Sequence, residues 1–360
     1  MPLKNKNLTE RRDRLQTIFS THQMDSLLIF NMSNIRYLSG FSGSEGILFI
    51  TRGETVLVID GRYTGQAALE TVGIRIQESS DKIRTIVQII QQKKLQRIGL
   101  EADSLALSQY HELAAPFQEK SFLSVTGELR MLRAYKDETE IACMRKAAGI
   151  ASAAIGTLIH RMKPGWTEKE TALQLELLAR QSGADGLSFE PIVASGPHSA
   201  LPHARPTNRK IRKGDFVVID FGVRYRGYCS DETCTVGIGK LTGRQKNAYQ
   251  IVKEAHDRAL DAIAADVPCA EIDRRARHAF GKYRKYFVHG TGHGVGLDVH
   301  EAPRLSATST DILKPGMVFT VEPGLYIPGL WGIRIEDTIF LKKNSCEKLT
   351  KMDKELTIIE

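Results

Sequence analysis

The feature that most constrains this chain is a set of acidic and histidine side chains in its C-terminal half. Four carboxylates and one imidazole occur at spacings that allow them to meet at one site: Asp220, Asp231, His293, Glu322 and Glu336. Burying four carboxylates together costs a large free energy unless cations hold them. Two divalent metal ions would do so, and such ions also lower the pKa of bound water. The sequence therefore predicts a fold built around a dinuclear metal centre.

The first acidic pair lies on two segments with the pattern of a β-hairpin. Asp220 ends the apolar run 216–219, which predicts a buried strand, and a second strand-like segment follows shortly after it. A hairpin centred between Tyr225 and Arg226 would place Asp220 opposite Asp231. Directly opposed residues share one face of a sheet, with Cβ atoms about 5 Å apart. Two aspartates there would repel each other, so we expect a metal ion between them.

The second acidic pair repeats this arrangement. Glu322 and Glu336 each follow an apolar run, and Pro328-Gly329 between them is a strong turn signal. A hairpin centred on Gly329 would place Glu322 opposite Glu336. Arg334 lies two residues before Glu336 and therefore points to the same face. We expect Arg334 to be a charge partner of the carboxylates.

Histidines gather between the two acidic hairpins. His289, His293 and His300 lie within twelve residues in the glycine-rich stretch HGTGHGVGLDVH, and His203 lies upstream in LPHARP. A single histidine is more often a surface or core residue than a functional group. Three histidines in one glycine-rich segment, which allows close backbone approach, indicate a functional role rather than a surface or core role.

These residues and their contexts resemble the pita-bread metallopeptidase family, which includes methionine aminopeptidase, aminopeptidase P and prolidase. That family's pattern is Asp, a second Asp eleven residues later, then His, Glu and Glu, and this chain matches all five positions. The segments IDFG, GYCSD, HGTGHGVG, VHEAP, VEPG and RIED match as well, and NIRYLSGFSGSEG and DGRYTGQA resemble the family's creatinase-like domain. The resemblance covers nearly the whole chain. It points to the Xaa-Pro branch, prolidase and aminopeptidase P, because methionine aminopeptidases usually lack the extra domain.

The resemblance implies an α+β protein with two domains. Residues 1–132 would form a creatinase-like α/β domain, and residues 133–360 a pita-bread catalytic domain with a curved antiparallel sheet covered by helices. The residue pattern agrees, because short strands and helices alternate in the first part of the chain. Asp137 with Glu140 also forms a helix-capping pair just after the expected boundary.

The resemblance also implies a role for each matching ligand. Asp220 would bind one metal ion, His293 and Glu322 would bind the other, and Asp231 and Glu336 would bridge both. Glu322 would in addition accept the proton of the attacking water, which makes it a catalytic residue as well as a ligand.

Residues around the ligands match the family too. His203, His289 and His300 would orient substrate and move protons as catalytic residues, and His203 and His300 would also bind substrate. Arg334 would support catalysis from just outside the ligands, and Arg304 would lie near the proline end of the substrate.

One position departs from the family pattern. The family commonly has Thr-Arg-Thr after the second aspartate, and this chain has Thr233-Cys234-Thr235. Because all five ligands are present, the departure bears on local electrostatics or subunit contacts rather than on metal binding.

The expected activity is hydrolysis of the peptide bond before proline by water that two metal ions activate. Four hard carboxylate donors and one nitrogen favour Mn²⁺, with Co²⁺, Zn²⁺ and iron as alternatives. Proline-containing peptides are the expected substrates and a homodimer the expected assembly. A methionine-aminopeptidase-like enzyme, a creatinase-like amidinohydrolase and a non-catalytic binding relative remain open. So does the choice between prolidase and aminopeptidase P.

Composition argues against two classes of partner. The net charge is +8, but aromatic residues are only 7% and no nucleic-acid-binding motif occurs, so no nucleic acid is expected. No apolar run approaches the eighteen residues that a membrane span needs, so no membrane is expected. The polar N-terminal segment does not have the pattern of a signal peptide. Five cysteines without a C-x-x-C motif indicate reduced thiols, and the expected location is cytoplasmic.

Overall fold

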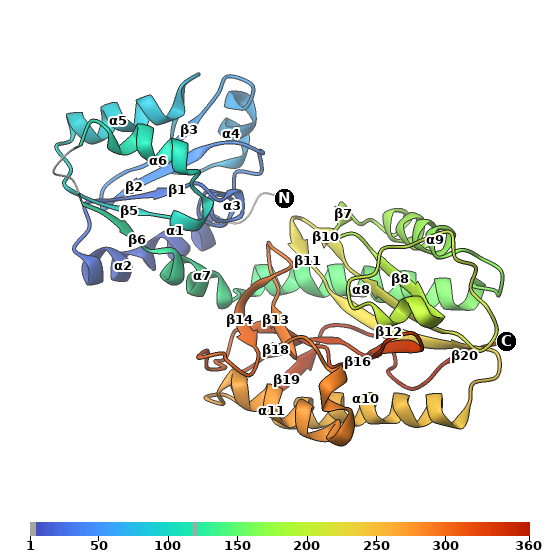
Figure 1. The fold of residues 1–360 in the computed structure, drawn as a ribbon. Coiled ribbons are helices and arrows are strands. Elements are labelled where there is room, and N and C mark those ends of the chain that lie inside the picture. The colour runs from blue at the N-terminus through green and yellow to red at the C-terminus, as the bar shows by residue number, and fades with distance from the viewer. Residues whose placement is uncertain (1–4, 118–120) are drawn as a thin grey trace. The chain divides into compact units, whose positions relative to one another are not determined.

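A computed structural model describes residues 5–117 and 121–360. The chain divides into two compact units, residues 1–133 and residues 134–360, and Figure 1 shows their helices and strands in chain order. Both units mix helices and sheets. The predicted fold class, a creatinase-like domain followed by a pita-bread domain, is confirmed.

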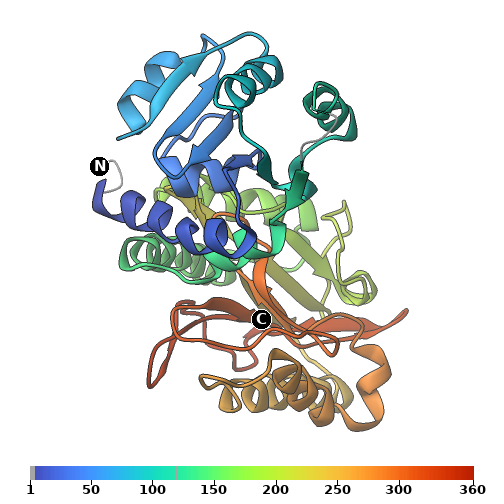
Figure 2. The same cartoon turned by 90° about the vertical axis from the view of Figure 1, so that its left-hand side faces the viewer.

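The N-terminal unit is a six-stranded sheet with the order β4-β3-β2-β1-β5-β6. Figures 1 and 2 show α5 and α6 on one face of this sheet and α1 and α2 on the other. Its strands are β1 (Ser26–Ile29), β2 (Ile47–Thr51), β3 (Thr55–Ile59), β4 (Arg75–Glu78), β5 (Arg97–Leu100) and β6 (Ser121–Ser124). Its helices are α1 (Asn5–Asp13), α2 (Leu15–His22), α3 (Met32–Ser39), α4 (Thr64–Glu70), α5 (Lys82–Gln92), α6 (Leu107–Ala114) and α7 (Thr126–Ala134), with the short η1 (Ala102–Ser104).

The C-terminal unit holds the predicted ligands in strands or directly beside strand ends, and these strands lie between two helix pairs (Figures 1 and 2). Its helices are α8 (Glu138–Arg161), α9 (Glu168–Gln181), α10 (Gly243–Asp261) and α11 (Cys269–Ala279), with the short η2 (Gly196–Ala200) and η3 (Gly281–Tyr286). One sheet has the order β20-β12-β9-β8, and a second has the order β14-β13-β15-β18-β19. Two small sheets, β11-β10-β7 and β16-β17, complete the unit.

The strands of this unit are short, and half of them are buried along their whole length. They are β7 (Gly186–Leu187), β8 (Ile192–Ser195), β9 (Phe216–Phe221), β10 (Val223–Tyr225), β11 (Tyr228–Cys229), β12 (Glu232–Ile238), β13 (Gly292–Gly294), β14 (Glu301–Leu305), β15 (Val318–Val321), β16 (Gly324–Ile327), β17 (Trp331–Arg334), β18 (Asp337–Leu341), β19 (Cys346–Lys348) and β20 (Ile358–Ile359).

Helix α8 is the longest helix of the C-terminal unit. Its N-terminus is the capping box predicted from the sequence, in which the Asp137 side chain accepts from the Glu140 backbone and Glu140 reciprocates. By length and composition alone α8 could cross a membrane, but 61% of its apolar stretch is buried inside the fold. Ile155 and Leu158 lie in one core cluster with Ile219 of β9. The helix therefore acts as a core helix that supports the strand carrying Asp220.

The first acidic hairpin has a different register from the one predicted. Asp220 pairs with Thr233, not with Asp231, so the predicted pairing was wrong by two residues. The hairpin turns at Arg226 and Gly227, whose φ angles are 51° and 83°. Positive φ at both central residues suits a two-residue turn between twisted strands. The turn lies one residue further along the chain than predicted. Asp231 still shares the face of Thr233 and Asp220, because a shift of two residues preserves the alternation of side chains.

The second acidic hairpin has the predicted centre. Gly324 pairs with Arg334 on β16 and β17, and Val321 pairs with Asp337 on β15 and β18, so both pairings are centred on Gly329. Gly329 has a φ of 74°, which suits glycine at the turn. Glu322 and Glu336 lie between the two paired segments. Both residues therefore lie outside the hydrogen-bonded strand pairs, at equivalent positions on either side of Gly329.

The turn of the first hairpin gives a stability prediction. Gly227→Ala is expected to lower the free energy of unfolding by about 1–2 kcal/mol, because a Cβ is strained in the left-handed region. Gly149→Ala is the matched control: Gly149 lies inside α8 with open space around its Cβ position. This change is expected to raise stability by about 0.5–1 kcal/mol. Urea unfolding of both variants tests the pair, and shifts of the same sign would contradict the assigned turn.

Candidate metal centre

Three predicted ligands form a compact cluster in the C-terminal unit. One ligand atom each from Asp231, His293 and Glu336 lies within 4.8 Å of the others. His293 Nε2 is 3.6 Å from Asp231 Oδ2 and 3.2 Å from Glu322 Oε1. Asp220 is close enough for its charge to raise the pKa of both Asp231 and Glu336. The structure thus brings all five predicted residues to one place.

The cluster concentrates negative charge away from solvent. Asp231 is 5% exposed and Glu336 is 1% exposed. Burial and the neighbouring carboxylates raise the pKa of both groups well above the ordinary range. Burial also raises the pKa of Asp220, although the Arg334 charge opposes this shift. Without a cation, it is therefore unfavourable for all of these carboxylates to be ionised at the same time.

Glu322 and His293 behave differently because they pair with each other. Burial would raise the pKa of Glu322, but its hydrogen bond to His293 and nearby positive charges lower it to about 2. Burial likewise opposes the charged form of His293, and the Glu322 contact outweighs it and raises the His293 pKa. Each of the two side chains thus favours the charged form of the other.

Two buried oxygens show that the residues fit a cation. Asp220 Oδ1 and Glu336 Oε1 are buried, and neither has a hydrogen-bond partner among residues 5–117 and 121–360. Buried polar atoms without partners are rare in folded proteins and need an explanation. Hard carboxylate oxygens are the donors that divalent cations prefer. Two such ions would satisfy these oxygens and offset the four negative charges.

Threonines and backbone groups orient the ligands. Thr233 Oγ1 donates to Glu336 Oε2 at 2.6 Å, and Thr320 Oγ1 donates to Glu322 Oε1 at 3.2 Å. His293 Nδ1 lies 3.1 Å from the carbonyl oxygen of Gly294, which leaves Nε2 facing the carboxylates. Such outer contacts fix the tautomer and the orientation of ligands. Glu336, Glu322 and His293 are therefore oriented by contacts within the protein itself.

Arg334 and Tyr326 form a polar chain that starts at Asp220. Arg334 Nη2 donates to Asp220 Oδ2 at 2.6 Å, and Nη1 donates to Tyr326 Oη at 2.6 Å. Tyr326 Oη lies 2.9 Å from His289 Nε2. His289 thus reaches the cluster through Tyr326 and Arg334. Sequence reasoning missed Tyr326, although its place two residues after Gly324, the partner of Arg334, puts it on the same face.

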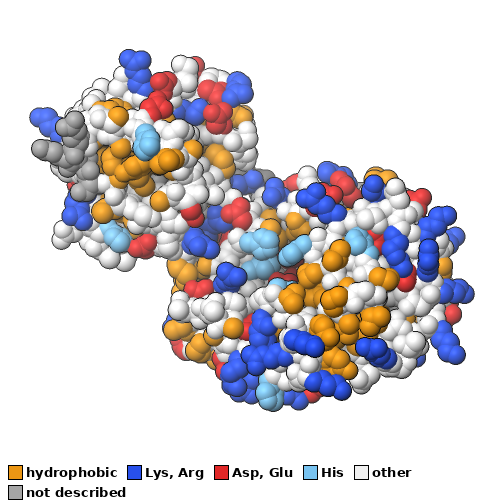
Figure 3. Space-filling view, in the orientation of Figure 1, with side chains coloured by type: hydrophobic (Ala, Val, Ile, Leu, Met, Phe, Trp, Pro, Cys, Tyr) orange, Lys and Arg blue, Asp and Glu red, His pale blue; other side chains and the backbone are white. Residues whose placement is uncertain are grey.

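The remaining predicted residues line the surroundings of the cluster. The His300 ring centroid lies 4.3 Å from that of His293, and both His300 and His203 are exposed. His203 follows Pro202, whose carbonyl oxygen accepts from Arg334 Nη1 at 3.2 Å. Figure 3 shows histidine side chains together on one face of this unit, next to acidic and apolar side chains.

Arg304 and Cys234 lie on opposite sides of this arrangement. Arg304 pairs with His293 across β13 and β14 and is exposed, so it shares the face of a predicted ligand. Cys234 alternates with Thr233 and belongs to the core cluster beneath β9 and β12. Burial raises the pKa of Cys234 to about 12, which keeps it a neutral thiol. The departure from the family pattern therefore lies on the core side of the strand.

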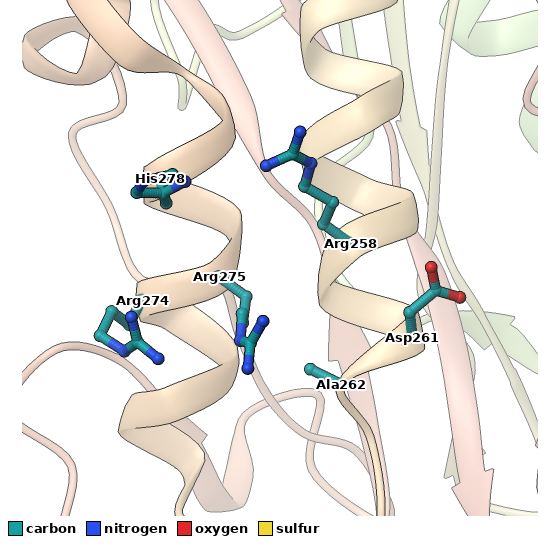
Figure 4. A pocket seen from close by; sticks show the side chains of 6 residues that line it. All are labelled: Arg258, Asp261, Ala262, Arg274, Arg275 and His278. Atoms are coloured by element: carbon teal, nitrogen blue, oxygen red, sulfur yellow. The ribbon is translucent and has the colours of Figure 1, made fainter.

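A separate hollow between α10 and α11 is not part of this site (Figure 4). Its volume is about 490 Å³, and it is lined by Arg258, Asp261, Ala262, Arg274, Arg275 and His278. Glu254 pairs with Arg258, and Glu271 pairs with both Arg274 and Arg275. The hollow contains none of the predicted ligands, and nearby carboxylates offset much of its positive charge.

The raised pKa values predict how the metal-free protein responds to pH. Unfolded aspartate and glutamate ionise near pH 4, whereas Asp231 and Glu336 hold their protons to higher pH in the folded state. The stability present below about pH 4 is therefore expected to fall as the pH rises through the raised pKa values. Added Mn²⁺ is expected to reverse this trend, because it binds the ionised carboxylates.

Thermal unfolding of EDTA-treated and Mn²⁺-loaded protein between about pH 5 and pH 8 measures how the stability of each form changes with pH. In the double variant Asp231→Asn with Glu336→Gln, stability should depend less on pH, since the new amides do not titrate. A metal-free wild-type protein whose stability climbs across this range would contradict the assignment.

Comparisons with known proteins agree with this geometry. The model of metallopeptidase family M24 matches residues 142–343, and that of the creatinase/prolidase N-terminal domain matches residues 11–135. The uncharacterized peptidase YqhT of Bacillus subtilis is 39% identical over 350 residues, which cover 96% of this chain and 99% of that protein.

Solved structures are similar over the same length. An Xaa-Pro dipeptidase from Bacillus anthracis has a TM-score of 0.94 at 38% identity, and the match covers 98% of this chain and all of that one. An X-Pro aminopeptidase from Thermotoga maritima has a TM-score of 0.88 at 36% identity, covering 96% of this chain and all of that one. The chain therefore belongs to metallopeptidase family M24 and carries a creatinase/prolidase N-terminal domain.

Proposed function

We propose that this protein is a metal-dependent peptidase that cleaves the bond between any residue and a following proline. The observation that carries the proposal is the convergence of one histidine with three buried carboxylates and one half-buried carboxylate. Two of their oxygens have no hydrogen-bond partner in the described part of the chain. The similar proteins named Xaa-Pro dipeptidase and X-Pro aminopeptidase support the same bond specificity.

In this proposal Asp220, Asp231, His293, Glu322 and Glu336 would hold two divalent ions, and Asp231 and Glu336 would serve as ligands to both. When bound, such ions supply a water of lowered pKa and polarise a substrate carbonyl. Mn²⁺ is the proposed metal, because hard oxygen donors dominate the set. Elemental analysis of protein purified without added metal would test its identity.

Glu322 is proposed to accept the proton of the attacking water. Burial opposes its charged form, but the contact with His293 keeps it ionised at neutral pH, as a proton acceptor must be. His300 and His203 are exposed beside the cluster and are proposed to donate hydrogen bonds to the substrate carbonyl oxygen. Arg334 holds Asp220 in place, and His289 steadies Arg334 through Tyr326.

Proline specificity has a physical reason. Proline nitrogen carries no hydrogen, so a peptidase that needs a hydrogen bond from that N–H cannot use this substrate. The site must instead recognise the ring and the free amine of the residue before it. Arg304 is proposed to lie near the proline end, where its charge would attract the carboxylate of a dipeptide.

The proposal also covers the assembly and the location of the protein. We propose a homodimer in the cytoplasm, which light scattering and cell fractionation would test. A methionine-aminopeptidase-like activity is the alternative to be tested beside it. A non-catalytic binding role is disfavoured, because all five ligand residues are present and converge.

A substrate panel tests the proposed bond specificity. Ala-Pro, Ala-Pro-Ala and Met-Ala-Ser are incubated with Mn²⁺ and, in parallel, with EDTA. Metal-dependent cleavage before proline is expected. Cleavage of Ala-Pro alone would indicate a prolidase, and preference for Ala-Pro-Ala an aminopeptidase P. Release of methionine from Met-Ala-Ser alone, or no metal-dependent cleavage at all, would contradict the proposal.

Glu322→Gln tests the proposed base. The amide keeps the size of the side chain but cannot accept a proton, so kcat is expected to fall by about 10²–10⁴-fold. Glu176→Gln on α9, where the partly exposed side chain pairs with Arg180, is the matched control and should leave kcat unchanged. A Glu322→Gln enzyme that retains wild-type kcat would exclude Glu322 as the base.

A further inference from the structure

Both proposed bridging ligands are followed in the sequence by a second buried acid. Glu232 follows Asp231 and Asp337 follows Glu336, and both Glu232 and Asp337 are fully buried. Successive residues of a strand point to opposite faces, so these acids lie behind the ligand face. A second layer of negative charge therefore underlies the metal centre.

One buried ammonium group lies between these two acids. Lys354 is 3% exposed, and its Nζ lies 2.7 Å from Glu232 Oε1 and 3.4 Å from Asp337 Oδ1. Burial opposes the charge of Lys354, but the two carboxylates outweigh burial and raise its pKa. The lysine backbone is held as well, because its carbonyl oxygen accepts from Tyr249 Oη of α10 at 3.0 Å.

The C-terminal segment 348–354 supplies further contacts to both acids. The Met352 amide donates to Glu232 Oε1 at 3.0 Å, and Thr350 Oγ1 donates to Asp337 Oδ1 at 2.6 Å. Lys348 Nζ lies 2.8 Å from Asp337 Oδ2, and His256 Nε2 lies 3.3 Å from the same oxygen. The segment thus crosses behind both ligand-bearing chains.

Ser152 of α8 adds a contact from the helix side. Its Oγ donates to Glu232 Oε2 at 2.5 Å and accepts from the Lys351 amide at 2.9 Å.

The two segments that carry Asp231 and Glu336 are also hydrogen-bonded to each other. Thr338 Oγ1 donates to the Asp231 carbonyl oxygen at 2.7 Å, and the Glu336 amide donates to the Thr233 carbonyl oxygen at 3.1 Å.

We propose that Lys354 is a positioning residue for the metal centre. Its ammonium group, shared by Glu232 and Asp337, holds the chains that carry Asp231 and Glu336 at the separation at which both carboxylates bind two ions. Without this charge, Lys348 and His256 would still face Asp337, but Glu232 would lose the ammonium group that pairs with it. The buried carboxylate of Glu232 would then be uncompensated and would repel that of Asp337. The role rests on the proposed function, because it concerns the affinity for those ions.

Calorimetric titration of metal-free protein with Mn²⁺ tests this role. Lys354→Met removes the charge and keeps an apolar chain of similar length. It is expected to weaken binding of at least one Mn²⁺ by about 10–100-fold, as loss of a contact behind a metal ligand typically does. Lys351→Met is the matched control: Lys351 lies in the same segment, is exposed and contacts the Lys348 carbonyl oxygen. It should bind Mn²⁺ like the wild type.

Circular dichroism at the titration temperature shows whether the variants are folded. If Lys354→Met does not fold, the same titration is made on the triple variant Lys354→Met, Glu232→Gln, Asp337→Asn, which buries no uncompensated charge. Weakened Mn²⁺ binding in the folded variant supports the positioning role. Wild-type affinity in the folded variant overturns it and leaves the proposed function standing, whereas a wild-type protein that binds no Mn²⁺ overturns the proposed function itself.

Discussion

The structure depends on one electrostatic constraint: four carboxylates meet in a buried place where too few positive charges face them. Arg334 pairs with Asp220, and His293 lies 3.2 Å from Glu322 and 3.6 Å from Asp231. Two positive side chains are thus too few for four carboxylates. The raised pKa values of Asp231 and Glu336 express the same imbalance. The surrounding threonines orient the oxygens but carry no charge. Divalent ions, which the M24 family implies, would resolve the imbalance.

The sequence predicted the face on which the ligands lie better than it predicted their pairing. Pro328-Gly329 marks a turn whose centre can be located from the letters, so the second hairpin has the expected register. The first hairpin turns at Arg226 and Gly227, and a positive φ at an arginine leaves little trace in a sequence. The error was an even number of residues, so the alternation of side chains still placed Asp231 on the correct face.

Contacts between distant parts of the chain could not be predicted in this way. Tyr326 looks like an ordinary strand residue until the register shows that it shares a face with Arg334. Lys354 lies more than one hundred residues from Glu232, and no local pattern relates them. Periodicity reports which side of an element is buried. It does not report which side chain from another segment meets it there.

The central claim is that the five residues hold two divalent ions. The most direct measurement is an anomalous difference map from crystals of the Mn²⁺-loaded protein, recorded at the manganese absorption edge. The account predicts two peaks, with Asp231 and Glu336 contacting both, Asp220 contacting one, and His293 with Glu322 contacting the other. A map without peaks among these residues, or with a single peak at full Mn²⁺ saturation, would contradict it.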